Sequence, residues 1–446
     1  MKLQLFAAML AVTMLVDGVQ AKQVKLDVAL AHPVMVTTGS KARAENHLRI
    51  GLTGFELTSD KQRKSVNVAI VIDKSGSMQG PKIEQAKQAA VQAVDRLSDA
   101  DIVSIVVYDS SVEVIVPATK ASDRREIKEK IARIQASGNT ALFAGVSKGA
   151  AEVRKFIDDK RVNRVILLSD GLANVGPASP SELEQLGLSL IKEGITVTTM
   201  GLGLGYNEDL MTKLAMASSG NHVFIEDAEN LARVFQNEFD DVLSVVAQKI
   251  HIVAKLAEGI RPVKVLNNAA EIAGQTVTID LGQLYSRQER YFVVEVEIPL
   301  GSPGSTRTVA EVTAEYTNMI TETTDRLASS VQVRFSDNEK LAEQAINKDI
   351  LASCIIQVAN ERNRLATQLR DAGDIEAAKK ELTDNAAYLD SYFNKLGVEE
   401  LKERRTRNSL QAENLSREKW SAGRKLMLEQ QFGDSVQQTY SGREPK

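Results

Sequence analysis

Between residues 66 and 245, short runs of hydrophobic residues alternate with longer stretches in which hydrophobic residues recur at helical spacing. Val66–Ile72 is apolar except for Asn67, which is typical of a strand buried on both faces. Pro81–Leu97 reads as an amphipathic helix with proline in its first turn. Further strands are expected at 102–108, 112–118, 165–168, 195–200 and 222–225, and further helices at 124–134, 141–157, 179–194, 208–217 and 228–245. This order predicts an α/β fold, a doubly wound, mostly parallel sheet with helices on both faces.

After residue 245 the hydrophobic residues recur at every second position, as in antiparallel strands with one buried face. Turns rich in Gly, Pro and Ser separate the strands expected at 275–284, 290–300, 306–316 and 327–335. Two stretches before residue 66, Val24–Leu30 and Leu48–Leu57, are also strand-like. We therefore expect residues 22–65 and 246–336 to form an antiparallel β-sandwich, with the α/β domain of residues 66–245 inserted in it.

The C-terminal part of the chain returns to helical spacing. Residues 337–400 contain one interruption, Asp371-Ala372-Gly373-Asp374, which predicts a helical hairpin. Residues 401–446 are polar and basic. We expect them to form a tail that is helical in part and disordered toward its end.

The first residues of the chain have the composition of a signal peptide. Lys2 gives a positive start, Leu3–Val16 is almost entirely apolar, and Val19-Gln20-Ala21 offers small residues before a cleavage site. We expect residues 1–21 to be removed; this run is too short to span a membrane, and no later stretch is long and apolar enough to do so. Cys354 is the only cysteine, which excludes a disulfide within the chain. An exported protein of this size without disulfides suggests a bacterial source, and a periplasmic or extracellular location.

Composition and charge narrow the possible partners. The chain is 43% hydrophobic and 26% charged, as in ordinary globular proteins. Its net charge of -4 at pH 7 gives no reason to expect a nucleic acid partner. The four histidines are scattered, and none has neighbours at the spacing of a nucleophile or a metal site.

Three separate stretches place oxygen-bearing side chains where the predicted parallel strands end. Asp73, Ser75 and Ser77 follow the first strand of the α/β domain, Thr140 precedes a helix, and Asp170 follows another strand. Ligands of open α/β sheets bind at the carboxyl ends of the strands, so we expect these five side chains to meet. Hydroxyl and carboxylate oxygens suit Mg²⁺ best, with Mn²⁺ or Ca²⁺ as alternatives, and the lack of His and Cys argues against zinc.

Such a site favours an additional anionic ligand from outside. Ser75, Ser77 and Thr140 are neutral, so a bound cation would keep most of its charge and attract an Asp or Glu carboxylate of a protein partner. The helix that begins near Pro81 would direct the positive end of its dipole toward the same place.

The pattern Asp73-x-Ser75-x-Ser77, followed by Thr140 and by Asp170-Gly171, resembles the metal-ion-dependent adhesion site of the von Willebrand factor type A family. The resemblance covers residues 66–245. It implies that the three hydroxyls contact the metal and that the two carboxylates act directly or through water. The whole chain resembles, less specifically, exported bacterial proteins and inter-alpha-trypsin inhibitor heavy chains, in which this domain is embedded in β structure.

Three functions are compatible with the sequence. The favoured one is an exported, non-enzymatic adhesion or scaffold protein that binds a partner carboxylate through the cation, with no catalytic residues. A metal-dependent hydrolase of the aspartate-based phosphatase type would need a second carboxylate at position 75, where a serine stands. The third is a structural component of an envelope assembly whose metal site is idle, with Ser and Asp serving as ordinary turn residues.

Overall fold

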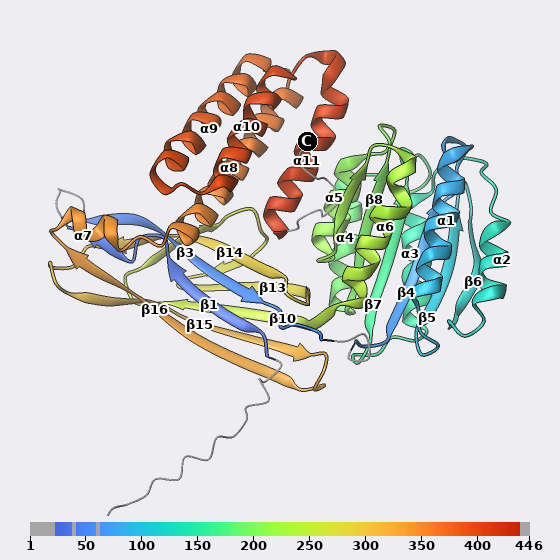
Figure 1. Cartoon of the computed structure of the whole chain (residues 1–446), viewed down its shortest axis with the longest axis horizontal. Coiled ribbons are helices and arrows are strands. Elements are labelled where there is room, and N and C mark those ends of the chain that lie inside the picture. The colour runs from blue at the N-terminus through green and yellow to red at the C-terminus, as the bar shows by residue number, and fades with distance from the viewer. Residues whose placement is uncertain (1–22, 38–41, 59–62, 438–446) are drawn as a thin grey trace, which may run out of the picture.

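The chain forms a β-sandwich, an α/β domain inserted in it, and a group of C-terminal helices that packs against both (Figure 1). The computed structural model describes residues 23–37, 42–58 and 63–437. The predicted signal peptide, residues 1–21, lies outside the described residues. The predicted fold class, an α/β domain inserted in a β-sandwich and followed by helices, is confirmed.

The α/β domain contains a six-stranded sheet with the strand order β6-β5-β4-β7-β8-β9. Its strands are β4 (Val66–Asp73), β5 (Ile102–Tyr108), β6 (Val112–Lys120), β7 (Val162–Ser169), β8 (Ile195–Leu202) and β9 (His222–Ile225). All neighbours are parallel except β5 and β6, which form a hairpin. The helices are α1 (Pro81–Arg96), α2 (Arg124–Ala132), α3 (Leu142–Arg154), α4 (Pro180–Lys192), α5 (Glu208–Ala217) and α6 (Leu231–Leu243).

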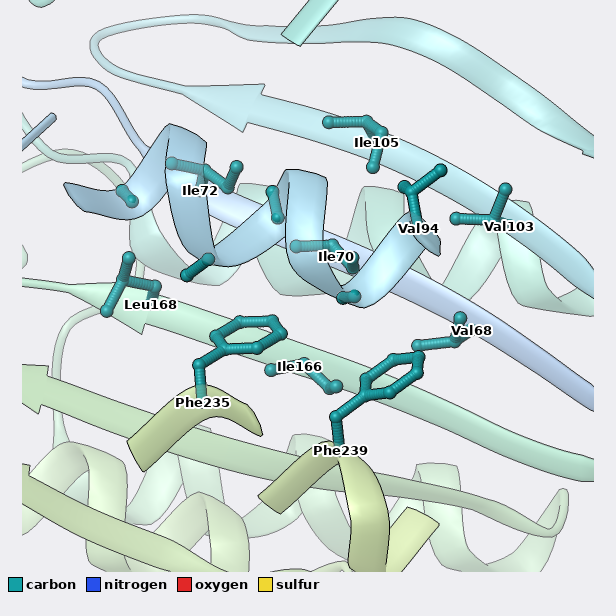
Figure 2. Close-up of a cluster of buried hydrophobic side chains, with 14 of the residues drawn as sticks. Val68, Ile70, Ile72, Val94, Val103, Ile105, Ile166, Leu168, Phe235 and Phe239 are labelled. Atoms are coloured by element: carbon teal, nitrogen blue, oxygen red, sulfur yellow. The ribbon is translucent and has the colours of Figure 1, made fainter. Parts of the chain in front are cut away.

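The central strand β4 is buried on both faces because helices cover each side of the sheet. Val68, Ile70 and Ile72 face α1 and α6 (Figure 2). Phe235 and Phe239 of α6 pack into the same core. The alternate residues of β4 face α3, α4 and α5 in a second core. A strand covered on both faces needs an almost continuous apolar sequence, which is the pattern seen in the chain.

The β-sandwich is assembled from both sides of the inserted domain. One sheet has the order β1-β3-β14-β11, and the other has the order β12-β13-β10-β15-β16-β2. The strands are β1 (Lys25–Leu30), β2 (Val34–Val36), β3 (Arg43–Thr53), β10 (Val245–Leu256), β11 (Arg261–Val265), β12 (Glu271–Ala273), β13 (Thr276–Tyr285), β14 (Glu289–Pro299), β15 (Thr306–Asn318) and β16 (Thr324–Ser336). β3 pairs with β14 along its whole length, so the two halves of the chain share one sheet. One pair departs from the antiparallel prediction, because β2 runs parallel to β16.

The C-terminal helices are more extensive than the sequence pattern predicts. They are α7 (Glu339–Gln344), α8 (Lys348–Asp371), α9 (Ile375–Leu396), α10 (Glu399–Glu413) and α11 (Arg417–Val436). The expected hairpin is present as α8 and α9, but residues 399–436 form two more packed helices where a polar tail was expected. Leu401, Met427 and Phe432 are buried, and these few apolar positions anchor otherwise polar helices. No helix of the described residues is long and apolar enough to cross a membrane.

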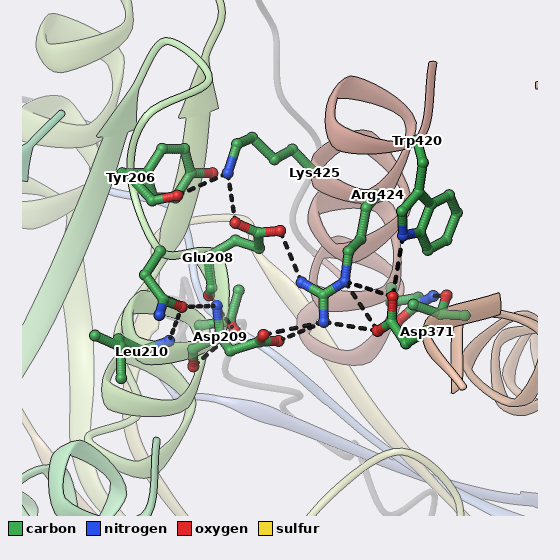
Figure 3. A network of polar contacts seen from close by, with 12 residues as sticks. Tyr206, Glu208, Asp209, Leu210, Asp371, Trp420, Arg424 and Lys425 are labelled. Atoms are coloured by element: carbon green, nitrogen blue, oxygen red, sulfur yellow. Dashed lines mark hydrogen bonds and ion pairs between the residues drawn. The ribbon is translucent and has the colours of Figure 1, made fainter. Parts of the chain in front are cut away.

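Helix α11 packs back onto the α/β domain (Figure 3). Two of its basic side chains contact acidic residues of that domain, rather than being solvated as in a polar tail. Lys425 is only 2% exposed; its ammonium donates to the carbonyl of Tyr206 at 2.7 Å and pairs with Glu208. Arg424 donates to Glu208 at 2.7 Å and to Asp209 at 3.0 Å. The charges of Arg424 and Lys425 are therefore matched by carboxylates at the start of α5.

Candidate metal-binding site

Asp73 is the last residue of β4 and its side chain is held in one orientation. It is fully buried, with an exposed fraction of 0%. Its Oδ1 accepts a hydrogen bond from the backbone N–H of Ser75 at 2.8 Å, and its Oδ2 accepts one from the Ser169 hydroxyl at 2.7 Å. Burial raises the pKa of Asp73, although the hydrogen bonds from Ser169 and Ser75 partly offset this effect.

Asp170 follows β7 and joins the first motif through a chain of hydroxyl groups. Its Oδ1 accepts a hydrogen bond from the Ser77 hydroxyl at 2.6 Å, and Ser77 Oγ lies 3.1 Å from Ser75 Oγ. Its Oδ2 forms an ion pair with the ammonium of Lys82. Because Lys82 stands in the first turn of α1, the start of this helix adjoins the site, as the sequence predicts.

Thr140 reaches the same place on the loop that precedes α3. The N–H of Gly76 donates to the carbonyl of Gly138 at 2.9 Å, which ties this loop to the first motif. A Cβ placed on Gly171 would lie 2.8 Å from Thr140 Oγ1 and 3.4 Å from Ser77 Oγ. The glycine after Asp170 therefore allows all three segments to approach one another.

The structure thus brings together the five residues predicted from the sequence. Four of them are buried, and Ser77 is exposed and opens the site toward solvent. Sequence reasoning missed two residues, Ser169 and Lys82, which hold the carboxylates of Asp73 and Asp170. A signal for Ser169 exists in the pairing of the strands, since Ile72 lies beside Leu168 and the next residues of each strand are therefore neighbours.

The arrangement fits a hard divalent cation. Among the residues that the structure describes, no group of three or more His, Cys, Asp or Glu side chains is placed to hold a metal, so this site depends on its hydroxyls. Oxygen ligands about 2.1 Å from Mg²⁺ in an octahedral shell lie about 3 Å from one another. The 3.1 Å between Ser75 Oγ and Ser77 Oγ matches that spacing.

A second ion pair, between Lys74 and Asp109, lies next to the site. Because the two charges cancel, this pair adds no net charge to the site. Lys74 pairs with Asp109, whose carboxylate also accepts hydrogen bonds from Ser111 and Ser137. Burial alone would raise the pKa of Asp109, but the hydrogen bonds from Lys74 and the serines lower it to about 2. This pair stabilises the loops on which Thr140 is positioned.

Comparison with known proteins agrees with this geometry. Residues 67–238 match the family model of the von Willebrand factor type A domain. This part of the chain is a von Willebrand factor type A domain. The vWA domain thus accounts for the sheet from β4 to β9, with the five candidate residues at the carboxyl ends of its strands or on the adjoining loop.

Relatives in sequence share the vWA domain and differ in how much else they share. The uncharacterised protein sll0103 of Synechocystis sp. is 24% identical over 345 residues, which is 75% of this chain and 81% of that protein. YfbK of Escherichia coli is 29% identical over 43% of this chain. Human inter-alpha-trypsin inhibitor heavy chain H3 is 28% identical over 34% of it. These two matches span only 34% of YfbK and 18% of the heavy chain.

Two solved structures share the fold beyond the vWA domain. A von Willebrand factor type A protein from Catenulispora acidiphila has a TM-score of 0.66 at 18% identity and covers 86% of this chain and 91% of its own. The ArnB paralog VWA2 from Sulfolobus acidocaldarius has a TM-score of 0.62 at 17% identity, with 93% and 98% covered. The likeness in fold therefore extends over most of the chain and not only over residues 67–238.

Proposed function

We propose that the protein is an exported adhesion or scaffold protein whose vWA domain binds a carboxylate of a protein partner through a divalent cation. vWA domains are generally interaction and adhesion modules, often metal-dependent, and named relatives of this chain are not enzymes. The observation that carries the proposal is the linked array of Asp73, Ser75, Ser77 and Asp170, with Thr140 beside it.

In this proposal the residues have distinct roles. Ser75, Ser77 and Thr140 contact the cation through their hydroxyls, and Asp73 and Asp170 balance its charge directly or through water. The cation supplies a Lewis-acidic centre that attracts an Asp or Glu side chain of the partner. Ser77 is exposed, which leaves that centre within reach of another protein.

Export is proposed from the sequence of residues 1–21, and a bacterial source from the single cysteine in an exported chain of this size. The proposed location is therefore the periplasm or the outside of a bacterial cell, where an envelope assembly is one candidate partner. N-terminal sequencing of the mature protein should begin at Lys22, and an intact Met1 would contradict export.

Metal binding by the five residues can be tested directly. We expect Mn²⁺, followed by electron paramagnetic resonance, and Mg²⁺, followed by calorimetry, to bind weakly to the wild type, because the ligands are mostly neutral. Asp73→Ala should abolish binding, whereas Ser77→Ala should weaken it less, since a water can replace one hydroxyl. Asp280→Ala, which removes an exposed aspartate of the sandwich, is the matched control. Wild-type affinity in Asp73→Ala would overturn the assignment of the site.

The same preparations separate the alternatives. Capture of a partner from an envelope extract in Mg²⁺, lost in EDTA and in Asp73→Ala, is expected for a metal-dependent binding protein. Capture that persists in EDTA would favour a structural component with an idle site. Metal-dependent turnover of a model phosphate ester would favour a hydrolase, which Ser75 in place of a carboxylate disfavours.

A further inference from the structure

Two large apolar side chains are exposed at the edge of the metal site. Leu172 is 59% exposed and follows Asp170-Gly171 directly. Leu204 is 51% exposed and lies between two glycines that contact the site. A Cβ on Gly205 would lie 2.8 Å from the carbonyl oxygen of Asp170, and one on Gly203 would lie 3.9 Å from the Lys82 ammonium. The loops that carry the two leucines therefore both adjoin the Asp170–Lys82 pair.

Charged residues near the site lie on the loop after β5, which carries Asp109, and on the segment after β9, which carries Glu226 and Asp227. Four other loops beside the site carry almost no charge. They comprise residues 74–80, 137–140, 171–179 and 203–207. Lys74 is their one charged residue, although 26% of the chain is charged, and it is paired with Asp109. Lys82, at the start of α1, is engaged by Asp170. Depletion of charged residues is typical of the centre of a protein–protein interface.

Scattered single hydrophobic residues on a surface need no explanation, but these two leucines differ from the others. Leu188 on α4 and Leu410 on α10 are exposed at 48% and 53% and belong to helices away from the site. Leu172 and Leu204 belong instead to two uncharged loops beside one carboxylate. The loops that carry both leucines therefore stand beside the place where a ligand anchored on the cation would sit.

We propose that this surface selects partner segments in which the metal-binding Asp or Glu has large aliphatic neighbours and no neighbouring charge. The cation attracts the carboxylate, while Leu172 and Leu204 are removed from water against the flanking side chains of the partner. A second carboxylate in the partner would add little binding energy, because the nearby cations Lys74 and Lys82 are already paired with Asp109 and Asp170. This inference rests on the proposed function, because the cation positions the segment.

The test uses immobilised synthetic peptides and the full mature chain. The peptides carry Leu-Asp-Leu, Ser-Asp-Ser or Leu-Asn-Leu between identical glycine flanks, and binding is measured at steady state in Mg²⁺ and in EDTA. We expect the Leu-Asp-Leu peptide to bind about fivefold or more tightly than the Ser-Asp-Ser peptide. The variant with Leu172→Ser and Leu204→Ser should lose this preference and still bind Mn²⁺ like the wild type. Leu188→Ser is the matched control.

Each result points to one conclusion. Equal Mg²⁺-dependent binding of the Leu-Asp-Leu and Ser-Asp-Ser peptides would overturn the apolar selectivity and leave the proposed function standing. Equal binding of the Leu-Asp-Leu and Leu-Asn-Leu peptides in Mg²⁺ would contradict carboxylate capture itself. Preference that survives in the double variant would show that other residues provide it. If the double variant fails to bind Mn²⁺, the single variants Leu172→Ala and Leu204→Ala decide, each expected to lose part of the preference.

Discussion

A single carboxylate, that of Asp73, connects the stability of the vWA domain with its metal site. Burial raises the pKa of this group above its ordinary value of 3.8, so the charged form is disfavoured in the folded protein. For an acid with a raised pKa, the folded state loses stability as the pH rises from the ordinary value through the raised one. A cation next to the carboxylate acts in the opposite direction, because it favours the charged form.

The substitution Asp73→Asn separates these two effects. In EDTA at pH 7 we expect the variant to be at least as stable as the wild type, because the amide oxygen still accepts the hydrogen bond of Ser75 and no buried charge remains. In saturating Mg²⁺ the wild type gains stability and the variant does not. Urea denaturation in both buffers measures this. A variant less stable in EDTA by more than about 1 kcal/mol would contradict the role given to burial.

The proximity of the five candidate residues was predictable because their residue types and their places at strand ends are visible in the sequence. Lys82 was not, since nothing in its sequence context shows that its ammonium reaches Asp170. The start of β7 was missed for a related reason. Asn163 and Arg164 are polar, yet both are buried, and Arg164 donates to Thr198 at 2.8 Å and to Tyr285 at 2.9 Å. A buried polar residue looks like a strand end until its partners are known.

Among the elements, α11 has the least expected position. Its side chains hold the β8–α5 loop and the start of α5, and Arg424 also pairs with Asp371 at the end of α8, where the indole of Trp420 donates at 3.1 Å (Figure 3). One helix thus ties the vWA domain to the helical hairpin. The polar, basic composition of residues 401–446 predicts a solvated tail, because a sequence pattern shows charge only locally. Two of the carboxylates that neutralise Arg424 and Lys425, those of Glu208 and Asp209, lie 215 to 217 positions earlier.

Loss of Lys425 should detach this helix. Lys425→Met leaves the Tyr206 carbonyl without its donor and Glu208 with one cationic partner fewer, and we expect unfolding to be easier by about 3 kcal/mol. Hydrogen exchange should rise in α11 before the rest of the chain. Lys419→Met, on the exposed face of the same helix, is the control and should be neutral. Protection of α11 equal to that of the wild type would contradict this anchoring.

For the whole molecule, the contact between the vWA domain and the sandwich includes an ion-pair cluster around Glu322. This residue, after β15, accepts from Lys64 at 2.6 Å and from Lys160 at 2.7 Å. Lys160 precedes β7 of the vWA domain and Lys64 lies in the segment that leads into β4. Their hydrogen bonds lower the pKa of Glu322 from 4.5 to about 2. An acidic group whose pKa is lowered in the folded protein stabilises the fold above its ordinary pKa. This stabilisation is lost as the pH falls through the pKa of the folded state.

The free energies of unfolding of the wild type and Glu322→Gln should therefore approach each other as the pH falls. Above pH 4.5 we expect the wild type to be the more stable of the two, and the difference should shrink between pH 4.5 and about 2. It should also shrink in high salt, since the cluster is exposed. Denaturation of both proteins across this range is the measurement, with Glu315→Gln on β15 as the control. A difference that stays constant with pH would exclude Glu322 as its source.

The insertion of the vWA domain between β3 and β10 also separates, along the chain, strands of the sandwich that pair with one another. Arg49 and Glu289 form an ion pair across β3 and β14 although 240 positions separate them. Closing so long a loop costs entropy and slows pairing. Once the vWA domain has collapsed, the strands entering and leaving it are neighbours, as the approach of Gly54 to Val246 shows. If the vWA domain folds first, the sandwich strands meet across a short effective loop, and the inserted domain then serves as an internal template for the domain that surrounds it.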